Sequence, residues 1–329
     1  MVVLVDIMSN FNPFLCCVVP AHNEAENLKH FIPALSQALK QQNIRFEIIV
    51  IDDGSKDSTI EVLQGLLKQY PLRVLEFSRN FGKEAALYAG LDHVDADLAL
   101  LIDADFQHPI NVIPTMLSLW KEGYEMVYGI RNRETESWLK KLFTHIYYKI
   151  LNASSTLNIP ENAGDFRLLD AKVVHAIRDL PERNLYMKGL YAWVGFKSIG
   201  ILFTEKERQC GRSSFNFKSL LNLAISGLTA FSDLPLRICI YLGILLGIFS
   251  FSYGCWITVQ TLFEGAKVPG WATLAAGLAF LGAIQLIFIG ILGEYISRIY
   301  SEVKARPKYI IAAEHSKNRQ AVPETESKS

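Results

Sequence analysis

Two long segments in the second half of the chain contain no charged residue. One covers residues 238–262, and the other, of similar length, covers residues 271–293. Because an α-helix of about 20 apolar residues crosses the hydrocarbon core of a bilayer, both segments are predicted to be transmembrane helices. The connection between them, residues 263–270, is short and therefore predicts a helical hairpin. A buried hairpin in a soluble protein is the alternative, which the length of both runs disfavours.

Basic residues flank this hairpin on one side. Arg237 precedes the first run, and the residues that follow the second run include Arg298, Lys304, Arg306 and Lys308. The connection carries a single basic residue, Lys267. Since positive residues favour the cytosolic side of a membrane, we predict an integral membrane protein whose N-terminal part and two termini are cytosolic.

The composition excludes some classes of partner. Lys+Arg and Asp+Glu both number 33, so the formal net charge is +0. A nucleic-acid-binding protein typically has a basic excess, and we therefore expect no nucleic-acid partner. The 5 cysteines show no spacing typical of a metal site or a disulfide framework. Residues 1–14 lack the basic and apolar regions of a signal peptide, and none is expected.

The first third of the chain alternates between short apolar runs and segments with helical spacing. Strands are predicted at residues 15–19, 46–51, 73–77 and 98–102, and helices at residues 24–41, 59–69 and 83–89. Asn23 is predicted to cap the first helix, and Asp57 or Ser58 the second. This alternation is typical of an α/β domain with a mostly parallel sheet. No strand-to-helix turn contains GxGxxG, which disfavours a dinucleotide oxidoreductase.

Acidic residues follow two of the predicted strands. Asp52 and Asp53 end the second strand, and Asp103-Ala104-Asp105 ends the fourth. Ligands of an open α/β sheet bind at the carboxyl ends of its strands. Carboxylate oxygens suit Mg²⁺ or Mn²⁺, which in turn can hold the phosphates of a substrate. The pattern predicts such a site at this edge, with ordinary acidic turn residues as the alternative.

The region before the hairpin is less regular. We predict a helix at residues 112–122 and a strand at residues 124–129. Residues 162–169 are predicted to be a turn that enters a further element, and residues 196–207 an edge strand. In residues 138–157, lysines alternate with aromatic and aliphatic residues. A helix of this kind packs in a soluble core or lies in a membrane interface. We favour the interface because the hairpin follows.

In combination, the segments VVPAHNE, IDDGSKDST and DADFQHP resemble the hallmarks of family 2 glycosyltransferases, which have the GT-A fold. The resemblance covers about residues 15–295. NAGDFRLLD, ERQCGRSSF, SGLTAFSDLPLR and the two-helix C-terminus resemble polyprenyl-phosphate glycosyltransferases. These include bactoprenol glucosyltransferases and, more distantly, dolichyl-phosphate mannose synthase. The QxxRW segment of processive synthases is absent.

The resemblance implies an α/β fold class: a GT-A, Rossmann-like nucleotide-sugar-binding domain, then interfacial helices and a two-helix transmembrane hairpin. The implied activity is inverting transfer of one sugar from a nucleotide sugar, with UDP-glucose preferred, to a polyprenyl (undecaprenyl) phosphate at the cytosolic face of a bacterial inner membrane. Taking a polyprenyl chain out of the bilayer costs about 0.8 kcal/mol per methylene. Helices near residues 138–157 and 217–231 are therefore expected to hold the active site at the membrane surface.

The resemblance also assigns roles to residues of this chain. The nucleotide-sugar pocket is assigned to Pro20, His22, Glu24, Asp53, Asp103, Ala104 and Asp105. The divalent cation, Mg²⁺ or Mn²⁺, is assigned to Asp103, Asp105 and Gln107. The catalytic set is Asp105, Asp165, Arg131, Arg167 and Arg208. The arginines are expected to hold phosphates and Asp165 to orient an arginine or the acceptor. His22 as a plain loop residue and the arginines as solvated surface residues are the alternatives.

One segment departs from the family pattern. Where the family commonly has G-x-S-K-aromatic, this chain reads Gly211-Arg212-Ser213-Ser214-Phe215. Ser214 thus stands in place of the lysine, and Arg212 is the nearest residue that can supply the charge.

We predict three regions and leave two rival functions open. The regions are a cytosolic glycosyltransferase domain at residues 1–235, two transmembrane helices within residues 236–295, and a partly disordered cytosolic tail at residues 296–329. Glycines in the hairpin allow close helix approach and hence a homo-oligomer. One rival uses the same donor with a diacylglycerol or glycan acceptor, for which Asp165 is the obvious general base. The other is a membrane scaffold without turnover.

Overall fold

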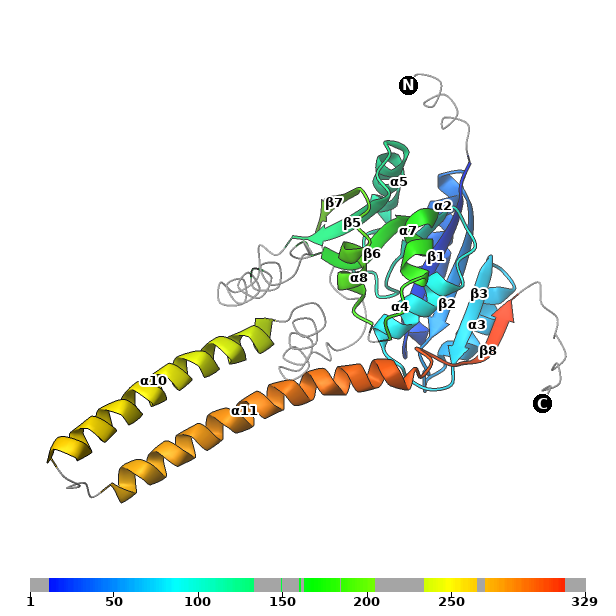
Figure 1. Cartoon of the computed structure of the whole chain (residues 1–329). Coiled ribbons are helices and arrows are strands. Elements are labelled where there is room, and N and C mark those ends of the chain that lie inside the picture. The colour runs from blue at the N-terminus through cyan, green and yellow to red at the C-terminus, as the bar shows by residue number, and fades with distance from the viewer. Residues whose placement is uncertain are drawn as a thin grey trace, which may run out of the picture.

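The computed structural model of the chain describes residues 12–132, 149, 160, 163–183, 185–204, 234–264 and 270–316 (Figure 1). Arg208, the segment 211–215 and the segment 217–231 lie outside the described residues, as does nearly all of the segment 138–157. The predictions made for these parts therefore remain predictions.

The described strands form one sheet of eight, in the order β7-β5-β6-β4-β1-β2-β3-β8. Their bounds are β1 Phe14–Ala21, β2 Arg45–Asp52, β3 Leu72–Phe77, β4 Leu98–Leu101, β5 Met126–Arg131, β6 Ala163–Asp170, β7 Ser198–Phe203 and β8 Ile311–Ser316. The four adjacent strands β4, β1, β2 and β3 run parallel to one another. The predicted α/β architecture with a mostly parallel sheet is confirmed for this central part.

Helices cover both faces of the sheet. Their bounds are α2 Ala25–Gln41, α3 Thr59–Leu67, α4 Lys83–Asp92, α5 Ile113–Lys121 after the short 3-10 helix η1 Ile110–Val112, α7 Ala171–Arg178 and α8 Met187–Trp193. One core cluster joins α2, α3 and α5 to the sheet, and a second joins α4, α7 and α8 to the opposite face. In β1, Cys17 lies in the first cluster and Val18 in the second. Burial on both faces explains why the central strands are continuous apolar runs.

Antiparallel strands flank the parallel centre. β6 pairs antiparallel with β4, with Arg167 opposite Leu101. The segment 162–169 was expected to be a turn, and this is wrong for Ala163–Asp170, which forms β6. The polar start of this segment resembles a turn, but the segment pairs with β4 on one side and with β5 on the other. As a result Asp165 and Arg167 belong to a rigid strand beside β4.

The last two helices form the predicted hairpin. α10 spans Leu234–Glu264 and α11 spans Trp271–Lys304. Each contains a segment long and apolar enough to cross a bilayer, Ile238–Ile257 and Phe280–Lys304. Large apolar side chains along both helices are exposed, for example Phe251 at 75% and Leu286 at 70%. Both helices extend away from the sheet in Figure 1, and within the described part of the chain the apolar segment of neither helix is buried.

The chain returns to the sheet after the hairpin. β8, at Ile311–Ser316, pairs antiparallel with β3, with His315 opposite Val74. Arg73 Nε on β3 donates to Glu314 Oε1 at 2.8 Å. Part of the region predicted as a cytosolic tail is therefore an edge strand, and it ties the end of α11 to the α/β domain (Figure 1).

Candidate active site

The loops after β1 and β2 hold each other in place. Asn23 has a left-handed backbone with φ of 56°. Its N–H donates to Ser55 Oγ, and its Oδ1 accepts the N–H of Lys56, both at 2.8 Å. The helix begins at Ala25 with Glu24 as its N-cap residue, so the prediction that Asn23 caps it is wrong. The side chain of Asn23 joins two loops instead.

One of the two side chains predicted to cap the second helix does so. Ser58 is the N-cap residue of α3, but its side chain makes no capping hydrogen bond. Asp57 Oδ1 accepts the N–H of Thr59 at 3.1 Å. Of the two predicted capping side chains, Asp57 is therefore the one that binds a helix N–H.

The Asp53 carboxylate binds the backbone of the loop after β3. Its Oδ1 accepts the N–H of Phe81 at 2.6 Å, and its Oδ2 accepts the N–H of Gly82 at 2.9 Å. Burial raises the pKa of Asp53, and these two N–H bonds oppose that rise. Gly54 has φ of +62°, and a Cβ there would lie 2.5 Å from a backbone carbon of the same loop. Asp53 thus fixes the start of α4, while a carboxylate has about four acceptor positions and keeps some of them for a ligand.

The other residues of the predicted donor pocket lie beside Asp53. His22 Nδ1 is 2.8 Å from the Asp53 carbonyl oxygen, and the His22 side chain is exposed. Pro20 lies in β1 opposite Ile51 of β2. Glu24 Oε2 accepts the amide N–H of Asn27. The structure therefore brings Pro20, His22, Glu24 and Asp53 to the same end of two neighbouring parallel strands.

The second acidic segment follows β4. After Leu101 the chain turns through Phe106, which has a left-handed φ of 61°. Asp105 Oδ1 accepts the N–H of Gln107 at 3.1 Å. Ala104 is 3% exposed and Asp105 is 9% exposed. The predicted metal ligands Asp103, Asp105 and Gln107 are thus gathered in one tight loop at the carboxyl end of β4.

A buried histidine supports this loop. The Asp103 N–H donates to His108 Nδ1 at 3.2 Å, and the imidazole stacks on Phe166 with ring centroids 5.0 Å apart. Burial lowers the pKa of His108, and the charge of Asp103 opposes this lowering. A neutral imidazole that accepts at Nδ1 satisfies the geometry. The sequence reasoning did not select His108, although its place directly after DADFQ was a signal.

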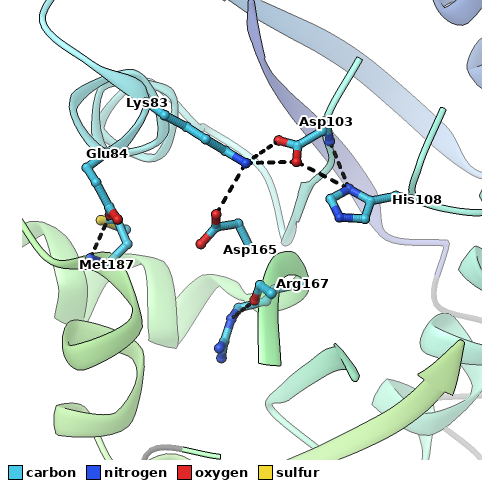
Figure 2. A network of polar contacts seen from close by, with 8 residues as sticks. Lys83, Glu84, Asp103, His108, Asp165, Arg167 and Met187 are labelled. Carbon is cyan, nitrogen blue, oxygen red and sulfur yellow. Dashed lines mark hydrogen bonds and ion pairs between the residues drawn. The ribbon is translucent and has the colours of Figure 1, made fainter. Parts of the chain in front are cut away.

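Lys83 lies between two carboxylates (Figure 2). Its Nζ is 2.7 Å from both Oδ1 and Oδ2 of Asp103 and 3.3 Å from Oδ2 of Asp165. Desolvation works against the charge on Lys83, but the two carboxylates outweigh it and raise the pKa of the amine. Desolvation likewise opposes ionisation of Asp103, and Lys83 outweighs it and lowers the pKa of Asp103 to about 2. The three groups form a charged network at the strand ends.

Lys83 was not predicted as a site residue, although one signal was available. It is the first residue of α4. The N-terminus of a helix carries a partial positive charge, so a cation there is unfavourable unless carboxylates compensate it. A lysine at this position, directly after Phe81-Gly82, therefore indicates nearby acidic groups.

Asp165 comes to the network from β6. Desolvation would raise its pKa, but Lys83 and Lys188 outweigh that effect and lower it. Its Oδ1 is buried and has no hydrogen-bond partner within the part of the chain that the structure describes. The side chain is therefore an ionised carboxylate with acceptor capacity to spare.

Two of the predicted phosphate-binding arginines lie nearby. Arg167, on β6, is 2% exposed. Its guanidinium lies over the Tyr191 ring at 4.2 Å, and its Nε donates to the Gly164 carbonyl at 3.1 Å. Arg131 ends β5 and is partly buried, and its Nε would be 3.7 Å from a Cβ at Gly164. Both guanidinium groups therefore approach the same stretch of β6, next to Asp165.

Helix α8 completes the surroundings of Asp165. Glu84, the neighbour of Lys83 on α4, accepts the N–H of Met187 at 2.8 Å and so holds the start of α8 (Figure 2). Desolvation, followed by the charge of Asp165, raises the pKa of Glu84 to about 7. Burial lowers the pKa of Lys188. Sequence reasoning selected neither Glu84 nor Lys188, because both look like ordinary helix surface residues.

The donors present fit a divalent cation that is shared with substrate phosphates. Among the described residues, no three His, Cys, Asp or Glu side chains are grouped as a metal cage. Mg²⁺ is commonly bound by one or two carboxylates together with substrate phosphates. Asp103 and Asp105 supply such carboxylates from one loop. The Oδ1 of Asp165, which has no hydrogen-bond partner among the described residues, is a further acceptor.

Comparisons with known proteins agree with these observations. Residues 16–178 match Glycosyl transferase family 2, and residues 234–299 match the GtrB C-terminal hairpin. A bactoprenol glucosyl transferase derived from prophage SfII of Shigella flexneri is 46% identical over 303 residues, which cover 92% of this chain and 98% of the relative.

Two further relatives extend across almost the whole chain. An uncharacterized glycosyltransferase of Synechocystis, sll0501, is 41% identical over 91% of this chain and 94% of its own length. The putative glycosyltransferase CsbB of Bacillus subtilis is 38% identical over 94% of each chain. The likeness therefore includes both the α/β domain and the hairpin.

Proposed function

The chain belongs to glycosyl transferase family 2, and from this premise we propose that it transfers one sugar from a nucleotide sugar to a polyprenyl phosphate at the cytosolic face of a membrane. The name of the Shigella relative, a bactoprenol glucosyl transferase, supports this acceptor and glucose as the sugar. UDP-glucose is the preferred donor and undecaprenyl phosphate the preferred acceptor. The basic residues beside the hairpin support the cytosolic orientation.

The observation that carries the acceptor is the position of Asp165, whose Oδ2 lies 3.3 Å from the Lys83 Nζ. A neutral hydroxyl acceptor needs a general base whose pKa lies near the working pH. Desolvation raises the pKa of Asp165, but Lys83 and Lys188 outweigh it and the pKa is lowered, so this carboxylate is a poor base. A phosphate oxygen is already anionic and attacks without losing a proton. This favours a polyprenyl phosphate over a diacylglycerol or glycan acceptor.

The proposed reaction is a single displacement. A bond forms between an acceptor phosphate oxygen and the anomeric carbon, while the bond from that carbon to the diphosphate oxygen breaks. The nucleoside diphosphate leaves with the bonding electron pair, and the anomeric centre is inverted. No proton needs to move in this step.

The residues of the chain hold two phosphorylated substrates together. Asp103 and Asp105, with Gln107, would hold Mg²⁺ or Mn²⁺, which when bound would offset negative charge on the diphosphate. Arg131, Arg167 and Arg208 are proposed to hold phosphate oxygens. Lys83 adds a positive charge 2.7 Å from Asp103.

The donor's base and ribose are proposed to lie at the ends of β1 and β2. There Asp53 offers acceptor positions to a base N–H while its backbone bonds hold the loop. Pro20, His22 and Glu24 line the same strand ends, and Ala104 is small enough to allow close approach of the nucleotide.

The membrane hairpin brings this site to the acceptor. A polyprenyl chain stays in the bilayer because each methylene removed costs about 0.8 kcal/mol. Helices α10 and α11 are long and apolar enough to cross the membrane. They would anchor the α/β domain where the phosphate of the lipid meets water.

The test is sugar transfer by the purified full-length protein in detergent. Radiolabelled nucleotide sugars are offered together with undecaprenyl phosphate, with Mn²⁺, with Mg²⁺ or with EDTA. We expect a labelled lipid that mild acid hydrolyses, formed from UDP-glucose and only in the presence of metal. The absence of labelled lipid from every donor, while nucleotide still binds, would remove the polyprenyl phosphate from the proposal.

A further inference from the structure

The cytosolic end of the second hairpin helix holds a loop of the catalytic domain. The Glu302 carboxylate, in the last turn of α11, accepts the backbone N–H of Arg183 at 3.0 Å to Oε1 and 2.9 Å to Oε2. The Arg183 guanidinium donates in turn to the Arg306 carbonyl at 2.8 Å. A carboxylate bound to a backbone N–H is one of the stronger protein hydrogen bonds. We call the contact between the Glu302 carboxylate and the Arg183 N–H, together with the bond from Arg183 to the Arg306 carbonyl, the Glu302 clamp.

Neighbouring residues strengthen the same junction. Lys308 Nζ donates to the Leu180 carbonyl at 3.2 Å and lies 3.7 Å from the centre of the Tyr88 ring. The Tyr309 hydroxyl donates to Asp92 Oδ2 at 2.6 Å. The stretch that follows α11 is thus seated on α4 and on the loop after α7. It fixes the hairpin relative to the catalytic domain.

The clamped loop leads directly to the active site. Shortly after Arg183 the chain enters α8 at Met187, whose N–H donates to Glu84 Oε2 at 2.8 Å. Further along α8, the ring of Tyr191 covers the Arg167 guanidinium at 4.2 Å. The start of α8 is therefore held by Glu84, as Figure 2 shows, and it follows closely in the chain after Arg183, which Glu302 binds.

We propose that Glu302 is a positioning residue for sugar transfer. Because it binds the loop before α8, it couples the position of α8 beside Arg167 and Asp165 to the position of the hairpin helix α11. This inference rests on the proposed function. The donor is held by the strand-end loops, whereas a lipid acceptor is held at a depth that the membrane fixes. The two substrates meet correctly only if the hairpin and the catalytic domain keep one relative position. The clamp is the described contact that links α11 to the segment beside Asp165.

The test compares two acid-to-amide variants of the full-length protein in nanodiscs that contain undecaprenyl phosphate. Glu302→Gln weakens the clamp, and we expect kcat to fall on the order of tenfold, as small misplacements of reacting groups do. The affinity for UDP should stay unchanged, because the donor loops are not touched. Glu314→Gln is the matched control: it also breaks a carboxylate contact of the C-terminal stretch, with Arg73, but on the far edge of the sheet. Its kcat should equal that of the wild type.

Two more measurements separate positioning from general stability. Arg183→Ala keeps the backbone N–H that Glu302 binds and removes only the bond to Arg306, so its loss of kcat should be smaller than that of Glu302→Gln. Hydrogen exchange should accelerate in residues 185–193 of Glu302→Gln and not in those of Glu314→Gln.

The outcomes are distinct. A wild-type kcat for Glu302→Gln contradicts the inference, and so does a parallel fall of kcat, UDP affinity and Tm, which would indicate a structural role. If the wild type transfers no sugar to a polyprenyl phosphate, the proposed function fails. In that case, unchanged hydrogen exchange in Glu302→Gln would overturn the clamp as well, and faster exchange confined to residues 185–193 would support it.

Discussion

The acidic loops after β2 and after β4 look alike in sequence but are used differently. Asp53 directs both carboxylate oxygens at neutral backbone N–H groups, those of Phe81 and Gly82. Asp103 faces a full positive charge, the Lys83 ammonium. The pKa values reflect this contrast, because burial raises that of Asp53, whereas Lys83 overcomes desolvation and lowers that of Asp103 to about 2. Asp53 therefore binds the backbone of a neighbouring loop, whereas Asp103 forms an ion pair with Lys83.

This contrast gives the two acidic loops at one edge of the sheet different roles. A carboxylate that bonds to backbone N–H groups keeps the pocket in shape whether or not a ligand is bound. A carboxylate that faces a lysine side chain can exchange that partner for a cation or a substrate. Two acidic segments with similar sequences, each at the end of a strand, can therefore have different roles.

The largest effect is expected for Asp103→Asn. Loss of this carboxylate charge should weaken the binding of the proposed cation. It should therefore lower kcat for sugar transfer on the order of 10²- to 10³-fold, as when one source of transition-state charge stabilisation is removed. Tm should also fall, because a pKa lowered to about 2 means that ionised Asp103 stabilises the fold by about 2 kcal/mol at neutral pH. Initial rates of labelled-lipid formation and thermal unfolding measure both effects. If Asp103→Asn turns over at nearly the wild-type rate, the Asp103 carboxylate is not needed for sugar transfer.

The next effect is expected for Lys83→Gln. We expect kcat to fall on the order of 10²-fold, and the loss should be greater at pH 5 than at pH 8. Lys83 lowers the pKa of Asp103 to about 2, so without it Asp103 takes up a proton at a higher pH. A pH–rate profile of Lys83→Gln beside Lys83→Arg, which keeps the charge, measures the shift. If the pH–rate profile of Lys83→Gln has the same shape as that of the wild type, Lys83 does not control the ionisation of Asp103.

For the loop after β2, the expected effect is on stability. Asp53→Asn replaces one acceptor oxygen by an amide N–H that faces a backbone N–H, and unfolding free energy should fall by about 1–3 kcal/mol. Tm in detergent should fall accordingly, and donor affinity should weaken by the same factor with and without Mn²⁺. An unchanged Tm together with lost turnover would mean that Asp53 acts mainly on the donor.

The smallest effect concerns Glu84, at the boundary of the charged network. Its pKa is raised to about 7, so it stabilises the fold in its protonated form, and this contribution is lost as the pH rises from about 4.3 through 7. Glu84→Gln keeps an acceptor for the Met187 N–H and removes the titration. Its stability relative to the wild type should rise by about 1–2 kcal/mol between pH 5 and pH 8, after allowance for solvent screening.

Tm at the two pH values checks this, with the surface variant Glu26→Gln as control, since Glu26 is 69% exposed. If Glu84→Gln and Glu26→Gln respond alike to pH, Glu84 does not titrate in this range.

The sequence allowed much of the charged loop to be predicted. Continuous apolar runs identify β1, β2 and β4, and the carboxyl ends of parallel strands are where ligands bind. Asp103, Asp105 and Asp53 follow from that reasoning alone. The fold of the family, a mostly parallel sheet followed by a helical hairpin, was likewise predicted from recognisable segments.

What was missed depends on contacts between distant parts of the chain. The position of Lys83 at the start of a helix indicates nearby acidic groups, but their identity is known only once β4 and β6 place Asp103 and Asp165 around it. β8 pairs with β3 through residues such as Arg73 and Glu314, which are 241 positions apart. No local pattern encodes such a pairing. The same holds for Glu302, whose clamp joins α11 to a loop that is remote in sequence.

The measurement that tests the division between the two loops most directly is the Mn²⁺ dependence of UDP binding, by calorimetry on the full-length protein in detergent. Wild type, Asp103→Asn and Asp53→Asn are compared. Mn²⁺ should tighten UDP binding in the wild type and in Asp53→Asn by the same factor, and should have no effect in Asp103→Asn. Full Mn²⁺ enhancement in Asp103→Asn, or its selective loss in Asp53→Asn, would contradict the account.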